Sequence, residues 1–290
     1  MIWVNAIIAG VLLGGLYALF ACGLSLMYGV MRIINLAHGD LAVLGAYLVL
    51  GLAMALGVEP ILVLPVAVIL MGILGYVLQR SLLERSLRAG PLVPLLTSFG
   101  LAIVIQNLLQ EVSTPDSRSI DGGALTTASL RISDQLSIPV LGLVIFSVAI
   151  ALLGGLHLFL SRTDLGRSMR ATAQDPDTAE LIGIDSRHMY GLATAIAVGT
   201  VTIAGTFFGM RSSFSPLAGP TQLIFAFETV VIGGIGSLWG TLVGGIVLGV
   251  AQTIGAQINP QYPVLFGNLV FLVVLIIRSS RAVGGRMSRA

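Results

Sequence analysis

The sequence predicts an all-α protein whose helices cross a lipid bilayer many times. Of the 290 residues, 56% are hydrophobic and only 10% are charged, whereas a soluble domain carries about 25% charged residues. The ionisable side chains also leave long apolar intervals between them, and about 20 apolar residues are enough to cross the hydrocarbon core as a helix. We therefore expect residues 1–290 to form a single membrane domain, a polytopic helical bundle.

The charge-free intervals predict where the spans lie. They cover residues 1–31, 41–58, 60–79, 89–110, 135–161, 188–210, 212–227 and 229–277. The last interval is long enough for two helices, and Asn259, Pro260 and Pro263 supply a break between them. Eight to nine spans are expected. The first 31 residues lack the basic region of a cleavable signal peptide, so we interpret them as a retained span.

Arginine placement predicts which ends of the spans face the cytoplasm. Arginines gather in residues 80–88, in 162–187 and in the tail, 278–289, whereas the segment 111–134 carries more acids than arginines. The first three segments should lie inside and the fourth outside. With nine crossings, the N-terminus is outside and the C-terminus is cytoplasmic.

The composition also excludes several classes of protein. All 15 basic residues are arginines, and a Walker A phosphate loop, a Schiff-base enzyme or a protein kinase would each need a lysine. Cys22 is the only cysteine and the three histidines are widely scattered, so we expect no metal site. The net charge of +2 does not indicate a nucleic-acid partner. We find no nucleophile with a matching base, so the sequence does not predict an enzyme.

Residues 212–240 depart from the pattern of a regular span. They contain Pro216, Pro220, Glu228 and a run of glycines that includes Gly233 and Gly236. We expect this stretch to cross once as a broken or re-entrant helix, which would line a passage because irregular backbone at membrane depth needs polar surroundings. Alternatively, glycines only let helices pack closely, which we expect for another eight: Gly14, Gly15, Gly199, Gly205, Gly209, Gly244, Gly245 and Gly249.

Polar side chains within the spans are the other candidates for a solute path. Asn35, His38 and Asp40 lie where the second span begins; they either orient a gate or path or cap the helix, with Asp40 against its positive end, and both can hold.

The fourth and seventh spans also carry polar side chains. Ser98, Gln106 and Asn107 interrupt the fourth span, where interhelical hydrogen bonding is the first explanation and a cavity lining the second. Glu228 is the single acid after residue 185, and we expect Arg211 to pair with it.

The segment 162–188 differs in character from the spans around it. Asp175 suits an N-cap, Pro176 the first helical position, Asp177 and Glu180 the positive end, and Gly183 the residue that closes the helix. These signals predict a helix of about two turns over residues 176–182. Because so short a helix does not persist alone in water, packing against a partner protein or the neighbouring loop should hold it.

Four motifs in order resemble those of one family, the permease subunits of bacterial ABC importers for branched-chain amino acids (the LivH/LivM group), which also serves other amino acids, amides and urea. The motifs cover residues 34–40 with 44–47, 97–101 with Gln106 and Asn107, 166–185, and 233–240. The resemblance covers nearly the whole chain. The compact chain is more similar to the LivH member than to LivM.

The resemblance implies several partners in the bacterial inner membrane: a second, LivM-like permease, two LivG/LivF-like ATPases that bind ATP and Mg²⁺, and an extracytoplasmic solute-binding protein. It also implies that the capped helix is a coupling helix on an ATPase, with contacts from Arg170, Gln174, Asp175, Pro176, Asp177, Ala179, Glu180 and Gly183. The chain itself would bind no cofactor. The alternatives are amide or urea cargo, or a self-contained secondary transporter that uses Glu228 or Asp40 as an ion site.

Overall fold

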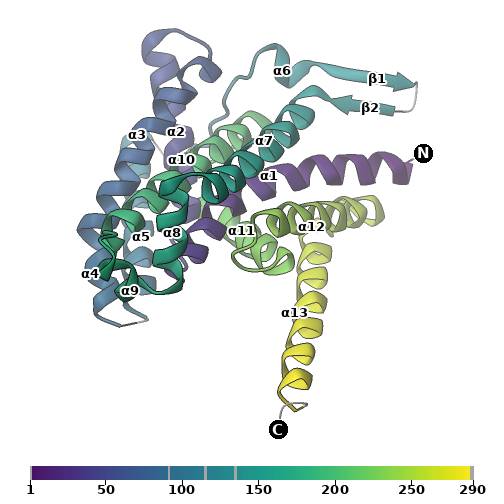
Figure 1. The fold of residues 1–290 in the computed structure, drawn as a ribbon. Coiled ribbons are helices and arrows are strands. Elements are labelled where there is room, and N and C mark those ends of the chain that lie inside the picture. The colour runs from purple at the N-terminus through teal and green to yellow at the C-terminus, as the bar shows by residue number, and fades with distance from the viewer. Residues whose placement is uncertain (1, 91, 114–115, 134–135, 288–290) are drawn as a thin grey trace.

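The computed structural model describes residues 2–90, 92–113, 116–133 and 136–287. Asp134 and Arg289, which the orientation argument used, lie outside these residues. The described chain is a bundle of helices with one small antiparallel hairpin (Figure 1). The predicted all-α, multi-spanning class is confirmed, and the hairpin is an addition that the sequence did not predict.

The long helices follow the predicted order along the chain. They are α1 (Ile2–Met31), α2 (His38–Leu56), α3 (Pro60–Leu78), α5 (Val93–Ser113), α7 (Val140–Arg162), α10 (Ser186–Arg211), α11 (Gly219–Gly233), α12 (Leu238–Ile258) and α13 (Pro263–Met287). Seven of these in the described chain are long and apolar enough to cross a membrane; α11 is shorter, and the apolar part of α13 is Pro263–Arg278. The total of eight to nine crossings stays a prediction.

The connecting elements lie at the two ends of the bundle. A π-helical turn (Gln79–Leu83), α4 (Glu84–Arg88), α8 (Asp164–Gln174) and α9 (Pro176–Leu181) lie toward one end, together with the C-terminal end of α13. The short α6 (Ala124–Thr127), the strands β1 (Ser129–Ser133) and β2 (Leu136–Pro139), and the start of α1 lie toward the other end (Figure 1). We call the end with α4, α8 and α9 the predicted cytoplasmic end.

Helices α1 and α10 form the centre of the bundle. In each, 72% of the most apolar 18-residue window is buried, compared with 22% in α3 and α7. The pairings repeat around this centre: α1 packs mainly on α12 as α10 packs on α3, and α2 and α11 touch each other. The three-helix groups α1–α3 and α10–α12 are therefore two related halves of the bundle's centre. Because α1 is the first and α10 the sixth long helix, the predicted topology makes these halves inverted repeats.

Glycines allow the closest helix crossing, that of α1 on α12. A Cβ atom at Gly249 would overlap the Gly10 carbonyl oxygen, and one at Gly14 would lie 2.6 Å from the Gly245 carbonyl oxygen. Small residues let membrane helices gain van der Waals contact that lipid tails cannot replace. The packing interpretation is confirmed for seven of the eight glycines; at Gly199 a Cβ atom would make only an ordinary contact, 3.4 Å from Val68.

The chain re-enters the bundle directly after α1. Arg32 adopts a left-handed φ of 56°, and His38, at the start of α2, approaches the Phe20 carbonyl oxygen with its Nε2 at 3.0 Å. Phe20 lies eleven residues before the end of α1, which is about 16 Å along a helix axis. Residues 32–37 therefore run back beside α1, and irregular backbone lies within the bundle at a place where the sequence predicted only a turn.

Residues 212–240 hold one continuous helix and not the broken helix that was expected, and their single crossing of the membrane stays a prediction. They contain the whole of α11, and the chain then reverses at Gly234 (φ 104°) and Gly236 (φ 81°), so that α12 returns antiparallel with Gly244 against Thr229. The irregular segments are the connections at 212–218 and 234–237. The interval ended too early in the prediction because Glu228 lies buried inside α11 and not at a helix end.

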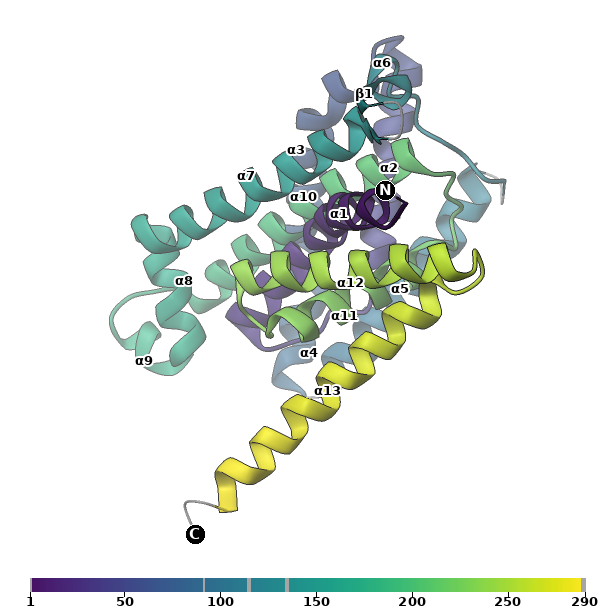
Figure 2. The same ribbon diagram turned by 90° about the vertical axis from the view of Figure 1, so that its right-hand side faces the viewer.

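Helix α13 begins where the sequence predicted a break. The Asn259 side chain accepts a hydrogen bond from the Gln261 backbone N–H at 2.9 Å, and the Tyr262 N–H donates to the Asn259 carbonyl at 2.9 Å. Figure 2 shows α13 leaving the bundle at an angle to α12. Arg278 holds it to α11 by donating to the Ile232 carbonyl at 2.9 Å, where a cation also suits the negative end of that helix.

Candidate functional site

Five of the predicted path residues lie together at the start of α2: the buried Asn35, His38, Asp40 and Ser98, and the half-buried Gln106. We call this group the α2-start cluster. The Leu36 backbone N–H donates to Ser98 Oγ at 3.0 Å, and the Gln106 amide donates to Asp40 Oδ1 at 2.9 Å. The Asn35 side chain accepts from the Ala37 N–H at 3.0 Å. The cluster thus fastens the re-entrant segment 32–37 to α5.

A second helix start meets the same cluster. Asp40 lies against Gly219, the first residue of α11, and a Cβ atom at Gly39 would overlap the Gly219 carbonyl oxygen. The N-cap residue of α2 is Ala37, which offers no side-chain cap, whereas Asp40 sits in the first helical turn. One carboxylate therefore lies near the positive ends of both α2 and α11, where its charge is favourable for each helix. Asp40 thus lies against the positive end of α2, as the cap interpretation predicted, but it is not itself the N-cap residue.

Asn107 lies apart from the α2-start cluster. Its side chain is exposed and donates to the Ile103 carbonyl of its own helix at 2.8 Å. One residue turns the helix by about 100°, so Gln106 and Asn107 cannot both face α2.

The Asp40–Gln106 hydrogen bond gives a stability prediction. In a double-mutant cycle of Asp40→Ala and Gln106→Ala, the two substitutions should be coupled by about 1–2 kcal/mol, because the bond is partly buried and its acceptor is a carboxylate. The measurement is the free energy of unfolding in mixed micelles. Asn107→Ala with Asp40→Ala is the matched control pair, and it should be additive. Additivity in the Gln106 cycle would contradict the geometry.

Glu228 lies 4% exposed on α11 and faces α13. The Asn268 side-chain amide is oriented so that its nitrogen faces acceptors, and this nitrogen donates to Glu228 Oε1 at 2.7 Å. The expected ion pair with Arg211 is wrong: none joins these two residues within the described chain. Arg211 ends α10 and lines a separate pocket with residues of α6 and α7. Glu228 instead contacts Asn268 of α13.

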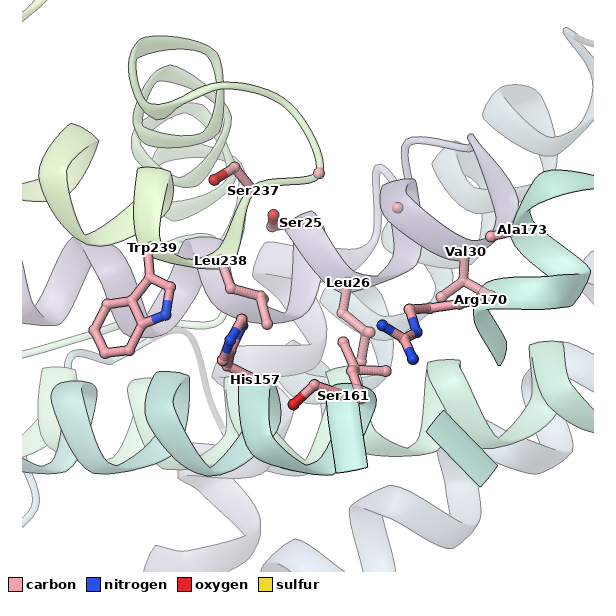
Figure 3. Close-up of a pocket in the computed structure, with 13 residues that line it drawn as sticks. Ser25, Leu26, Val30, His157, Ser161, Arg170, Ala173, Ser237, Leu238 and Trp239 are labelled. Atoms are coloured by element: carbon pink, nitrogen blue, oxygen red, sulfur yellow. The ribbon is translucent and has the colours of Figure 1, made fainter. Parts of the chain in front are cut away.

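The two predicted path glycines have different roles. Gly233 allows close packing between α11 and α12, and Gly236 lies in the turn that joins these helices. A Cβ atom at Gly233 would overlap the Gly240 carbonyl oxygen across the α11–α12 hairpin. Gly236 has a left-handed φ of 81° and lines a pocket of about 350 Å³ at the predicted cytoplasmic end (Figure 3). Neither glycine contacts the α2-start cluster among the described contacts, so the predicted path residues fall into separate groups.

The predicted capped helix is confirmed as α9. The Asp175 side chain accepts from the backbone N–H groups of Asp177 and Thr178, each at 3.1 Å. At the other end, Gly183 has φ 86° and donates to the Glu180 carbonyl, while Ile184 donates to the Ala179 carbonyl, both at 3.0 Å. This pair of bonds is a Schellman motif. Both ends of the helix are therefore fixed by local hydrogen bonds.

Thr178 fixes the charge of the cap. Its hydroxyl donates to the Asp175 carboxylate at 2.6 Å, and this bond, with the backbone N–H of Thr178, holds the pKa of Asp175 below its usual value. Asp175 therefore stays ionised at neutral pH and keeps a negative charge at the start of α9.

Sequence reasoning missed α8, which joins α7 to α9. The Thr163 side chain caps it by accepting from the Gly166 N–H at 3.0 Å, and its buried face consists of Gly166, Met169 and Thr172. Threonine followed by small or apolar residues three apart was the available signal. Gly166 packs directly on the backbone of Phe159 and Leu160, so α8 is fixed rigidly to the end of α7.

The exposed surface of α9 is unusually apolar for a loop. Leu181 is 87% exposed and Ile182 is 71% exposed, and Ala179 is the one buried residue of the helix. Nothing else in the described chain covers these two side chains. Two large aliphatic groups at a helix end are typical of a surface that another protein covers.

These features define a class: a multi-pass helical membrane protein with a rigid helical loop at one end. The chain belongs to the family described as "Branched-chain amino acid transport system / permease component", which matches residues 6–278.

Proteins named as branched-chain amino acid permeases are similar to this chain over most of its length. The chain is 32% identical to the high-affinity branched-chain amino acid transport system permease protein BraD of Pseudomonas aeruginosa, over 97% of this chain and 96% of BraD. It is 27% identical to LivH of Escherichia coli, over 95% and 93%. LivM of the same organism is 25% identical, and 66% of its length is covered. The LivH-like resemblance is confirmed.

Proposed function

We propose that the chain is the membrane-spanning permease subunit of an ATP-driven ABC importer for branched-chain or other hydrophobic amino acids, located in the bacterial inner membrane with its C-terminus in the cytoplasm. The family and the names of BraD and LivH support the cargo class. The observation that carries the mode of action is α9, a helix capped at both ends that presents Leu181 and Ile182 to the outside.

In this proposal, α9 is the coupling helix and seats in a groove of an ATPase subunit. Asp175, Pro176, Asp177 and Gly183 shape the helix, while Leu181 and Ile182 supply the apolar contact. Motion of the ATPases would pass through α9 to α8, which is packed on α7, and so tilt the bundle. Gln174 ends α8. Arg170 is an exception within the predicted coupling set because its side chain lines the pocket of Figure 3.

The proposal requires partners. A LivM-like permease, two LivG/LivF-like ATPases and a solute-binding protein complete the importer, and ATP and Mg²⁺ bind to the ATPases. The absence of lysine from this chain agrees with that division of labour.

The contact surface of α9 gives a direct test. Leu181→Asp should abolish co-purification of the ATPases and lower solute uptake at least about tenfold, since a charge would enter an apolar contact. Leu165→Asp on α8 is the matched control, because Leu165 is also exposed (46%) and lies on the same loop. Normal uptake by Leu181→Asp in an assembled complex would refute the role of α9.

A self-contained secondary transporter is the second candidate, and it rests on Glu228. Within the described chain, the buried Glu228 Oε2 has no hydrogen-bond partner, which leaves this oxygen free to bind an ion. Reconstitution of the full chain alone decides between the two: gradient-driven uptake that Glu228→Gln abolishes would favour this candidate over the importer. Uptake of an amide or urea, measured with the complete importer, would instead change the cargo and keep the mechanism.

A further inference from the structure

A pocket outside the α2-start cluster and α9 lies at the predicted cytoplasmic end, between α1, α7, α8 and the turn that joins α11 to α12. Its volume is about 350 Å³. Figure 3 shows Trp239 and His157 side by side at one end and Arg170 at the other; the two rings are 6.2 Å apart. The residues between them include Ser25, Leu26 and Leu238.

The pocket carries positive charge and lies at the N-terminus of α12. Arg170 makes no ion pair among the described residues, and no acidic side chain lines the pocket. Ser237 caps α12 by accepting from the Gly240 N–H at 3.1 Å, so the N–H groups of Leu238 and Trp239 remain without acceptors inside the helix. An arginine and a helix N-terminus together favour an oxyanion.

A buried hydroxyl supplies an independent indication of a ligand. Ser25 is 1% exposed and lines the pocket, and its Oγ has no hydrogen-bond partner within the described chain. In Figure 3 this hydroxyl points toward the turn at Ser237. A buried hydroxyl without a partner costs about 1–3 kcal/mol, and an anion in the pocket would accept its hydrogen bond.

The surroundings of the pocket indicate where the anion comes from. Val243 and Val247 follow Trp239 along α12 at intervals of four residues, so the three side chains share one face of the helix. Both valines are exposed. Across from them, Gly154 of α7 faces Trp239, where a Cβ atom would lie 3.9 Å from the indole, and Ile150 is exposed one turn farther. An apolar track therefore leads from the pocket into the membrane between α7 and α12.

We propose that this pocket binds an anionic phospholipid, whose headgroup and phosphate extend from the start of α12 past Ser25 toward Arg170 and whose acyl chain lies along Trp239, Val243 and Val247. A zwitterionic amino acid fits less well, because its ammonium group would find no carboxylate in the pocket. Basic pockets between spans at the cytoplasmic face are typical lipid headgroup sites. The site goes beyond the proposed transport function and places a lipid beside α8.

The two tryptophans of the chain provide the test, because Trp3 lies at the start of α1 and Trp239 at the start of α12, beside the other end of α1. The full chain with Trp3→Phe is reconstituted in bilayers that contain a small fraction of acyl-brominated phosphatidylglycerol or brominated phosphatidylcholine, and Trp239 fluorescence is recorded. The anionic lipid should quench about five times more effectively per mole, as one arginine near an anionic lipid permits. The reverse variant, Trp239→Phe, should show no preference at Trp3.

Substitutions then locate the site. Arg170→Gln should remove the preference and Ser25→Ala should reduce it, whereas Arg162→Gln, an exposed arginine outside the pocket, should leave it unchanged. Equal quenching by the two lipids, or an equal loss with Arg162→Gln, would overturn the proposal in favour of a general surface charge effect. Loss of the preference on addition of inorganic phosphate would overturn it in favour of a soluble anion.

Discussion

Gly249→Val is expected to lower the yield of folded protein at least about tenfold, because the overlap it creates is with backbone. A Cβ atom at Gly249 would overlap the Gly10 carbonyl oxygen and lie 2.7 Å from the backbone nitrogen of Gly14. Neither atom can move unless α1 and α12 separate, and α1 is one of the two most buried helices. Monodisperse protein after gel filtration in detergent, together with the thermal midpoint, measures the effect.

Gly51→Val is the matched control for this prediction. Gly51 lies on α2, and a Cβ atom there would meet nothing within 4 Å. The same change of residue should therefore leave yield and thermal midpoint nearly unchanged. Equal losses from both variants would mean that valine itself, and not the α1–α12 crossing, causes the defect.

Ala179→Pro should impair both the stimulation of ATP hydrolysis and solute uptake, as the proposed role of α9 requires. Ala179 is the buried residue of α9, and its N–H donates to the Asp175 carbonyl at 3.0 Å. Proline removes this donor and breaks a helix of six residues, at a cost of about 3 kcal/mol or more. In the assembled importer, stimulation of ATP hydrolysis by loaded binding protein and solute uptake should each fall at least about tenfold.

Asp164→Pro is the corresponding control. Asp164 is the first residue of α8 after the Thr163 cap, and its side chain is exposed. Proline is tolerated at a first helical position because the N–H there has no intrahelical acceptor. Near-normal uptake by this variant is expected. Full stimulation of ATP hydrolysis by Ala179→Pro would show that α9 does not transmit the signal.

The span boundary misplaced at Glu228 and the incorrect pairing of Glu228 with Arg211 share one physical cause. Charge-free intervals locate spans only if charges lie at the membrane edge, and Glu228 breaks this assumption because Asn268, forty residues later, stabilises it inside the bundle. For the same reason, the prediction that Arg211 pairs with Glu228 is wrong: the buried Glu228 is hydrogen-bonded by Asn268. Sequence offered Arg211 as the nearest charge along the chain, whereas the position of α13 decided which side chain faces Glu228.

The α2-start cluster shows how far residue patterns reach into a site. Motifs marked Asn35, His38, Asp40, Ser98 and Gln106 as unusual polar residues within spans. That they converge depends on the re-entrant segment 32–37, which returns beside α1 and places α2 against α11. No local pattern predicts this return, since it depends on hydrogen bonds across about sixty residues of chain, as between Leu36 and Ser98.

By itself, the sequence determined that this chain is a multi-spanning helical membrane protein, where α13 begins, and how α9 is capped. Each of these follows from local physics: apolar length, proline and asparagine breaks, and side chains that satisfy their own backbone. The tertiary structure alone decided that residues 32–37 re-enter, that α11 and α12 form a hairpin, and that Ser25, Arg170 and Trp239 share one pocket. Those arrangements depend on packing between helices far apart in the chain, which local patterns do not encode.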